Sequence, residues 1–330
     1  MPRTVVVTGS SAGAGRAIAR AFGARGDRVA LLARNLDGLQ AAAQEVRRAG
    51  GQALPLVVDV SDAEAVDAAA ERVERELGEI DVWVNDAMQT VFSPLTQLTA
   101  HEFHRVTEVT YLGSVHGTMA ALRHMLPRDR GTIVQVGSAL AYRGIPLQSA
   151  YCGSKHALRG FYDSVRAELV HDKSRVWVAE VQMPALNTPQ FRLSRSHMPH
   201  KAQPVAPIYQ PEVAARAVVY ASEHRRRTVW VGTSTVGTVI AGTVAPRLLD
   251  LFLGRTNYQA QQIDEPEVPG RPDYLDGPVP GDHGTHGPFD DRAHARSAQL
   301  ALSTHRPALL AFAATALAAA GTVRSRRAAR

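Results

Sequence analysis

The chain has 330 residues, of which 45% are hydrophobic and only 6% aromatic, so it can build a large core of small apolar side chains. Its formal net charge is +6, but the excess lies in short basic clusters at 224–227 and 324–330 rather than in a stripe with interleaved aromatics, which argues against nucleic-acid binding. The single cysteine, Cys152, excludes an intramolecular disulfide framework and a multi-cysteine metal site, and it favours a reducing, cytoplasmic location.

Short β-branched runs alternate with helical stretches from the N-terminus onward, and nothing that resembles a signal peptide precedes the first run. The spacers place apolar residues at helical spacing, as in residues 62–77. This alternation predicts an α/β fold with a doubly wound, parallel, seven-stranded Rossmann-type sheet and helices on both faces. The predicted strands are residues 5–8, 29–33, 53–58, 82–85, 132–137, 176–181 and 228–231.

A glycine-rich turn, TGSSAGAG, directly follows the first predicted strand and precedes a helical stretch. Glycines allow a tight turn and a close approach of the backbone to a pyrophosphate, and the helix N-terminus supplies free N–H groups. The sequence therefore predicts a dinucleotide-binding loop. The loop residues assigned to cofactor binding are Thr8, Gly9, Ser10, Ser11, Gly13, Ala14 and Gly15.

The end of the second predicted strand bears on the choice of cofactor. A carboxylate there would accept hydrogen bonds from the 2′-hydroxyl of NAD, but the position holds Ala33, and Arg34 follows it. A guanidinium suits a 2′-phosphate in charge and in the geometry of its donors. We therefore expect NADP(H) to be preferred, with NAD(H) as the alternative.

Three side chains near the fifth predicted strand form a candidate acid–base group. Ser138 ends the strand, Tyr151 lies 13 residues further on, and Lys155 follows Tyr151 by four. Residues four apart share a helix face, so the Lys155 ammonium can lie near the Tyr151 hydroxyl. A nearby cation favours the phenolate and lowers the tyrosine pKa, which allows proton exchange with a carbonyl or an alcohol.

These motifs, in this order, resemble the short-chain dehydrogenase/reductase family over about residues 4–255. The resemblance implies an NADP(H)-dependent oxidoreductase that interconverts a carbonyl and an alcohol by hydride transfer. It implies that Ser138 binds the substrate oxygen and that Tyr151 is the general acid/base. Lys155 would hold the nicotinamide ribose and lower the Tyr151 pKa.

The same resemblance assigns further cofactor contacts. Asp59 and Val60, after the third predicted strand, would touch the adenine ring, and Asn85 would belong to the wall of the cofactor site. Pro184 begins a stretch similar to the family's PGxxxT, with alanine in place of its glycine, and Thr188 ends it. Thr188 would bond the nicotinamide carboxamide.

Two positions depart from the family's pattern. The turn after the fourth strand reads Asn-Asp-Ala-Met where the family has Asn-Asn-Ala-Gly, which introduces the carboxylate of Asp86 and the side chain of Met88. Thr110 stands where relatives usually have an asparagine that holds a proton-relay water, and a threonine offers fewer hydrogen-bonding groups. Thr110 is kept as a candidate catalytic residue. These departures leave open a regulatory, cofactor-binding protein with impaired catalysis.

The chain is predicted to have three parts. Residues 1–255 form the catalytic domain, and residues 256–295, rich in Pro, Gly and Asp, are expected to be a disordered linker. Residues 296–330 predict an alanine-rich apolar helix with an arginine-rich end. Its apolar run, 307–323, is marginal for a membrane span, so a docked helix and a peripheral membrane contact both stay open. The latter would suit a membrane-associated reductase of hydrophobic carbonyl compounds.

The connection over residues 190–210 is predicted to be the substrate lid, because it follows the cofactor stretch and precedes the next helix. It holds three basic residues and no acid, so it suits an acidic substrate or is a solvated basic loop. The Asp/His group at 282–286 lacks a convincing set of metal ligands, and no metal is expected. Besides a small-molecule substrate, we expect a second copy of the chain as a partner, as in the family.

Overall fold

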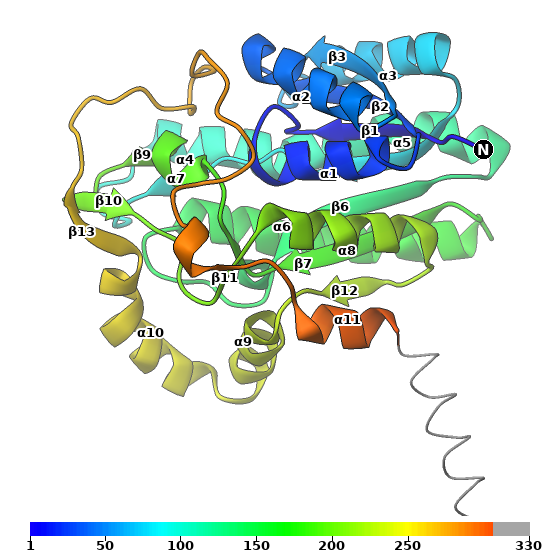
Figure 1. Cartoon of the computed structure of the whole chain (residues 1–330). Coiled ribbons are helices and arrows are strands. Elements are labelled where there is room, and N and C mark those ends of the chain that lie inside the picture. Colours follow the sequence, from blue (N-terminus) through cyan, green and yellow to red (C-terminus); the bar gives the residue numbers. More distant parts are fainter. Residues whose placement is uncertain (306–330) are drawn as a thin grey trace, which may run out of the picture.

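The computed structural model describes residues 1–305 of the chain. Its centre is a parallel sheet of seven strands in the order β12-β7-β6-β4-β1-β2-β3 (Figure 1). The strands are β1 (Thr4–Thr8), β2 (Arg28–Ala33), β3 (Gln52–Val57), β4 (Ile80–Asn85), β6 (Thr132–Ser138), β7 (Trp177–Met183) and β12 (Thr228–Trp230). The predicted doubly wound α/β fold is confirmed, and every predicted strand lies within two residues of its observed bounds.

Helices cover both faces of this sheet. One layer consists of α1 (Gly13–Gly23), α2 (Leu36–Arg48) and α8 (Pro211–Glu223), and the other consists of α3 (Ala63–Leu77), α5 (Gly113–Met125) and α6 (Ser149–His171). Successive strand residues point to opposite faces, so Val5 and Val7 pack in the first layer and Val6 packs in the second. Both layers are therefore closed over apolar strands.

Side-chain caps fix where several of these helices begin. The Asn35 side chain accepts a hydrogen bond from the backbone at the start of α2, and Asp62 does the same for α3. Helix α4 (Ala100–Thr107) starts with a reciprocal capping box between Thr99 and Glu102. A π-helical segment, η1 (Glu108–Leu112), joins α4 to α5.

Short elements build up the carboxyl edge of the sheet. The predicted lid, 190–210, is structured and includes four of them. These elements are β5 (Val91–Phe92), β8 (Ala185–Leu186), α7 (Gln190–Leu193), β9 (Arg195–Ser196), β10 (His200–Ala202) and β11 (Ile208–Tyr209), with the 3-10 turns η2 (Leu126–Arg128) and η3 (Ala139–Ala141) elsewhere. Beyond the last sheet strand, α9 (Thr233–Val244) and α10 (Pro246–Ala260) form a helical hairpin.

The structure differs from the prediction of a disordered linker over 256–295. This segment holds the end of α10, β13 (Gln262–Pro266), η4 (Asp290–Arg292) and β14 (Ala293–His294), and then α11 (Ala298–Thr304) follows. Residues 271–287, which we name the C-terminal strap, run across the carboxyl edge of the sheet, in orange in Figure 1. A segment without its own core is ordered here because the body of the protein supplies the partners.

Ion pairs and one buried leucine attach the C-terminal strap. Arg195 bonds Asp273 at 2.9 Å and Asp276 at 2.8 Å, and Arg16 pairs with Asp282. Leu275 is fully buried. The predicted domain boundary at residue 255 therefore falls inside α10, and the strap is part of the catalytic body. The predicted apolar run over 307–323 lies outside the described residues, of which no helix has both the length and the apolarity to cross a membrane.

Candidate active site

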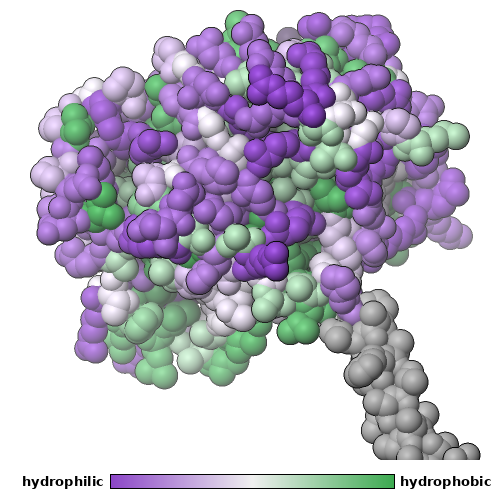
Figure 2. Space-filling view, in the orientation of Figure 1, coloured by the Kyte–Doolittle hydropathy of each residue, from purple (hydrophilic) through white to green (hydrophobic). Residues whose placement is uncertain are grey.

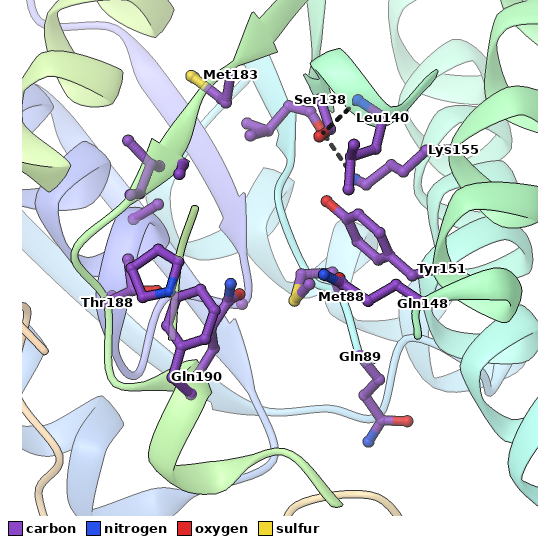
Figure 3. Close-up of a pocket in the computed structure, with 18 of the residues that line it drawn as sticks. Met88, Gln89, Ser138, Leu140, Gln148, Tyr151, Lys155, Met183, Thr188 and Gln190 are labelled. Atoms are coloured by element: carbon purple, nitrogen blue, oxygen red, sulfur yellow. Dashed lines mark hydrogen bonds between the residues drawn. The ribbon is translucent and has the colours of Figure 1, made fainter. Parts of the chain in front are cut away.

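A cavity of about 500 Å³ lies at the carboxyl ends of the sheet strands. Its walls are the glycine loop after β1, the ends of β6 and β7, the lid, the α9–α10 hairpin and the C-terminal strap. In open α/β sheets, ligands bind at this edge, where the chain changes direction between helix layers. Figure 3 shows Thr188 and Gln190 on the opposite side of this cavity from Tyr151.

The glycine loop lies where the sequence predicts it, but only part of it faces the cavity. Gly9, Ser11, Gly13 and Ala14 line the cavity. Gly9 has φ +71°, and a Cβ there would lie 2.8 Å from the Ala87 Cα atom, so the turn tolerates only glycine. The backbone is thus left bare toward the cavity.

Three loop residues that were predicted to contact the cofactor pack against neighbouring parts of the protein instead of lining the cavity. The Thr8 hydroxyl oxygen accepts hydrogen bonds from the backbone N–H groups of Asp86 (3.0 Å) and Ala87 (3.1 Å). The Ser10 hydroxyl donates to the Leu32 carbonyl at 3.4 Å, and Gly15 packs against the Gly9 carbonyl. Thr8, Ser10 and Gly15 thus hold the loop on its neighbouring strands, and their assignment to cofactor contact stays a prediction.

Arg34 lines the cavity, as predicted, and the C-terminal strap holds it in place. Its guanidinium donates to the carbonyl of Tyr274 and, at 3.5 Å, to that of Leu275. The Asp59 carboxylate lies 3.7 Å from it, and Asp59 also pairs with Arg105. Burial lowers the Arg34 pKa, and the Asp59 charge opposes that effect. Asp59 and Val60 also line the cavity, beside Arg34.

Ser138, Tyr151 and Lys155 converge on this cavity from β6 and α6. The Ser138 oxygen accepts a hydrogen bond from the Leu140 N–H at 3.1 Å and bonds the Tyr151 hydroxyl. The Lys155 Nζ atom donates to the Val136 carbonyl at 2.9 Å and lies 5.5 Å from the centre of the Tyr151 ring. In Figure 3 the Tyr151 hydroxyl points into the cavity, toward Ser138.

The pKa values in this group differ from the expectation. Burial raises the pKa of Tyr151, and its bond with Ser138 opposes that effect only in part. Burial also lowers the pKa of Lys155 to about 8, against the attraction of Asp86. The prediction that Lys155 lowers the Tyr151 pKa is therefore not met, because desolvation dominates and the ammonium is bonded to a backbone carbonyl.

Asp86, which the family's pattern lacks, is partly buried in the cavity wall close to the glycine loop. A Cβ on Gly15 would lie 2.8 Å from its Oδ2 atom. Burial raises the Asp86 pKa to about 7, while the charge of Lys155 and the Gly15 N–H favour the carboxylate. The site thus holds a carboxyl group that changes charge near neutral pH.

We expect Asp86→Asn to change the pH dependence of stability. Because the folded pKa of Asp86 is raised, its stabilising contribution is full below about pH 4 and is lost as pH rises through about 7. Between pH 5 and 7, the free energy of unfolding of the variant should therefore rise relative to wild type, by about 2 kcal/mol. Urea unfolding at both pH values measures this difference. Exposed Asp264→Asn is the control, and equal shifts in both variants would contradict the role of burial.

Asn85 and Thr110 do not line the cavity, and their assigned roles stay predictions. Asn85 accepts from the Trp83 indole at 2.9 Å and donates to Thr118 at 3.0 Å and Tyr162 at 3.1 Å. The Thr110 hydroxyl accepts from the Gln89 N–H at 2.9 Å and donates to the Gln89 carbonyl at 3.0 Å. Both polar groups are used in fixing the turn after β4 and the helix beside it.

Pro184 and Thr188 line the cavity after β7. A Cβ on Gly13 would lie 3.3 Å from the Thr188 Cβ atom, so Thr188 stands beside the glycine loop. The preceding Asn187 is fully buried, and its amide donates to Asp290 at 2.8 Å. The stretch that reaches toward the cofactor loop is thus anchored by the C-terminal part of the chain.

The lid has little positive charge to offer a substrate. Arg195 is paired with two strap carboxylates, and Lys201 lies 2.8 Å from Glu265. The lid residues that line the cavity are Gln190, Phe191, Leu193, Gln203, Pro204, Val205 and Ala206. The expectation of an acidic substrate therefore loses its basis, and the wall is largely apolar.

The sequence alone does not predict that the C-terminal strap and the α9–α10 hairpin form part of the cavity wall. The Gly284 carbonyl accepts the Gly13 N–H at 3.0 Å, and Asn35 donates to Val279 at 2.7 Å and to Gly281 at 2.9 Å. The cavity-lining residues from these parts are Ser234, Thr238, Leu249, Phe252, Leu253, Asn257, Tyr274, Pro278, Val279 and His283. The Asp/His group at 282–286 makes ion pairs, and no cluster of metal-ligating side chains occurs within residues 1–305.

The doubly wound sheet, the glycine loop and the Ser–Tyr–Lys group at the carboxyl edge define an α/β oxidoreductase of the dinucleotide-binding class. The sequence model of the short chain dehydrogenase family matches residues 3–199, and the chain belongs to this family, whose members use NAD or NADP.

Relatives and solved structures agree with this membership. The chain is 31% identical to the uncharacterized oxidoreductase YxnA of Bacillus subtilis over 81% of this chain and 76% of the relative. It is 28% identical to a fatty acyl-CoA reductase of Acinetobacter baylyi, over 76% and 83% of the two chains. The structure of an alcohol dehydrogenase from Thermococcus sibiricus, complexed with 5-hydroxy-NADP, superposes with a TM-score of 0.60 at 28% identity, covering 70% of this chain and 96% of that one.

Proposed function

We propose that this protein is an NADP(H)-dependent oxidoreductase that interconverts a carbonyl and an alcohol, with Tyr151 as general acid/base. One observation carries the proposal: the hydroxyls of Ser138 and Tyr151 meet in the same cavity as the glycine loop and Arg34. A proton donor would thus lie within reach of a substrate oxygen, beside residues that suit a dinucleotide. The alcohol dehydrogenase with a bound NADP derivative supports the same chemistry.

The residues present fit NADP(H). The backbone left bare at Gly9 suits a pyrophosphate, and Arg34 offers a cation for the 2′-phosphate at the end of β2. Asp59 and Val60 would contact the adenine. Pro184 and Thr188 would hold the nicotinamide end, and Lys155 would hold its ribose. When bound, the cofactor supplies or accepts the hydride.

Side chains of the protein would carry out the proton transfer that accompanies hydride transfer. Ser138 and Tyr151 would both hydrogen bond the substrate oxygen, which polarises the carbonyl. During reduction, Tyr151 would give its proton to that oxygen. Lys155, with its lowered pKa, and Asp86, with its raised pKa, also line this cavity. Because Thr110 is turned away, we assign it no part in the relay.

The cavity walls favour a hydrophobic carbonyl compound. Phe191 of the lid, Met183 at the end of β7, and Leu249, Phe252 and Leu253 of α10 all line the cavity. A related reductase acts, by its name, on fatty acyl-CoA. Long-chain aldehydes and ketones are therefore the first compounds to test.

NADPH oxidation with ketones, aldehydes and quinones tests the proposed function. We expect turnover with at least one hydrophobic carbonyl compound. NADPH binding without any turnover would instead favour the alternative of a regulatory, cofactor-binding protein, which Asp86 and Met88 suggest. A direct binding measurement beside the kinetic assay separates the two.

Arg34→Ala tests the cofactor choice. We expect the Kd for NADPH to rise about 10- to 100-fold, the worth of a charge-assisted contact, while the Kd for NADH changes much less. Because the loss of bonds to the C-terminal strap affects both cofactors equally, the ratio of the two Kd values isolates the 2′-phosphate. Arg143→Ala, also on the cavity wall, is the matched control. An unchanged ratio in Arg34→Ala would overturn the preference for NADPH.

A further inference from the structure

The α9–α10 hairpin has two faces with different surroundings. Its inner face forms a wall of the cavity through side chains of both helices, such as Thr238 and Leu253. Its outer face has no neighbour within residues 1–305 that covers it. The exposed apolar residues there are Ile240 (55% exposed), Val244 (77%), Leu248 (69%), Leu251 (52%) and Phe252 (58%). We name these five residues the hairpin patch.

Figure 2 shows the hairpin patch as a green area on the lower edge of the molecule, over α9 and α10. On α10, Leu251 and Phe252 lie three and four residues after Leu248, and Arg255 lies four and three residues after them, so the four residues form one stripe. Contiguous apolar patches on a protein surface mark interaction sites. A helix that carries apolar residues beside arginines is suited to lie in the interface of a membrane.

The charges around the hairpin patch indicate which kind of partner would bind there. Arg247 and Arg255 are exposed on α10 and form no ion pair within the described part of the chain. The one acid of the hairpin, Asp250, is bonded to Arg143. The patch is therefore basic as well as apolar. Anionic lipid headgroups complement that charge, whereas a second copy of the same patch would repel it.

The remaining chain starts on the same side of the molecule. Helix α11 ends at Thr304, and its Gln299 accepts the Gly232 N–H at 2.9 Å, next to the start of α9. The 25 residues that follow position 305 comprise the apolar run 307–323 and five arginines. This sequence has the same apolar and basic character as the patch, so the two do not neutralise each other, and both suit an anionic bilayer.

The cavity and the hairpin patch meet at Phe252. Phe252 belongs to both, because it lines the cavity and more than half of its surface is exposed. A compound dissolved among lipid acyl chains would thus reach the cavity along an apolar path.

We propose that the outer face of the α9–α10 hairpin docks on an anionic membrane surface and that the substrate is a lipophilic carbonyl or alcohol that enters from the bilayer. The docking stands on the patch alone, whereas the substrate class rests on the proposed function.

Vesicle sedimentation with the full-length protein tests the docking. We expect binding to vesicles of equal parts phosphatidylcholine and phosphatidylglycerol, and weaker binding to phosphatidylcholine alone. The double variant Leu248→Asp/Leu251→Asp, whose two positions do not line the cavity, should lower the partition coefficient about tenfold or more. The control Val57→Asp/Val170→Asp adds the same charge at exposed apolar positions (59% and 77%) elsewhere and should bind like wild type.

Two results would overturn the docking. Equal vesicle binding of the hairpin variant and wild type would show that other residues carry any membrane contact. The second result combines two observations: the wild type does not bind vesicles, and light scattering shows that the hairpin variant has lost an oligomeric state that the wild type has. Together they would assign the patch to contact with a second copy.

Turnover distinguishes failure of the docking from failure of the proposed function. The hairpin variant should reduce a water-soluble ketone like wild type but should lose about tenfold in rate with a vesicle-borne long-chain ketone. If wild type turns over no carbonyl compound at all, the proposed function fails, while the sedimentation result still decides the docking.

Discussion

Tyr151→Phe is expected to lower kcat by about 10²- to 10⁴-fold, the usual worth of a positioned general acid. The substitution removes the hydroxyl that bonds Ser138 and points into the cavity, but it keeps the ring that packs beside Lys155. The Kd for NADPH should stay within about threefold of wild type, because the ring and the Lys155 contact remain. Stopped-flow NADPH oxidation and fluorescence titration provide the two measurements.

Cys152→Ala is the matched control for this variant. Cys152 is adjacent to Tyr151 on α6, and burial raises its pKa to about 11, so it is a neutral thiol at physiological pH. It does not line the cavity. We expect nearly full activity from Cys152→Ala. If Tyr151→Phe kept the same activity as this control, the acid–base assignment would be wrong.

Gly15→Val should weaken NADPH binding by about 100-fold or more and destabilise the protein by about 1–3 kcal/mol. A Cβ at this position would lie 2.5 Å from the Gly9 carbonyl oxygen and 2.8 Å from the Asp86 carboxylate. The loop must move to admit the side chain, and its backbone then no longer forms the phosphate cradle. Calorimetric titration with NADPH and thermal unfolding without it measure the two effects.

Gly160→Ala is the corresponding control, because Gly160 lies in α6 and a Cβ there meets no atom within 4 Å. Alanine favours a helix over glycine, so the variant should be as stable as wild type or slightly more stable. NADPH affinity in Gly15→Val equal to that of this control would contradict the close packing of the loop.

The sheet could be predicted because its signals are local. Each strand is a short β-branched run, and the helices between them show their own periodicity and caps, such as Asp62 before α3. The glycine loop joins two consecutive elements, the Tyr151–Lys155 pair lies within one helix, and the structure brings both to one cavity. Their spacing along the chain therefore predicts most of the relative positions of their residues.

Side-chain direction and long-range contact could not be predicted in this way. Thr8 and Asn85 lie at the carboxyl ends of the correct strands, yet their polar groups bond neighbouring elements instead of facing the cavity. Thr110 is turned toward the Gln89 backbone. The C-terminal strap has the composition of a linker and is ordered by partners such as Arg16 and Arg195, far away in sequence. The composition of a segment indicates how much apolar surface it can bury by itself. It does not indicate which distant residues will contact the segment in the folded protein.

The late position of the C-terminal strap in the sequence also affects when the cleft can form during synthesis. A ribosome makes the chain from its N-terminus, and the sheet can assemble from residues up to the end of β12. The Gly13 N–H meets the Gly284 carbonyl, and Arg34 meets Tyr274, only after the last sixth or so of the chain begins to emerge. A nascent chain therefore holds a folded sheet with one side of its nucleotide cleft open. This side of the cleft therefore closes only after the C-terminal strap has been made.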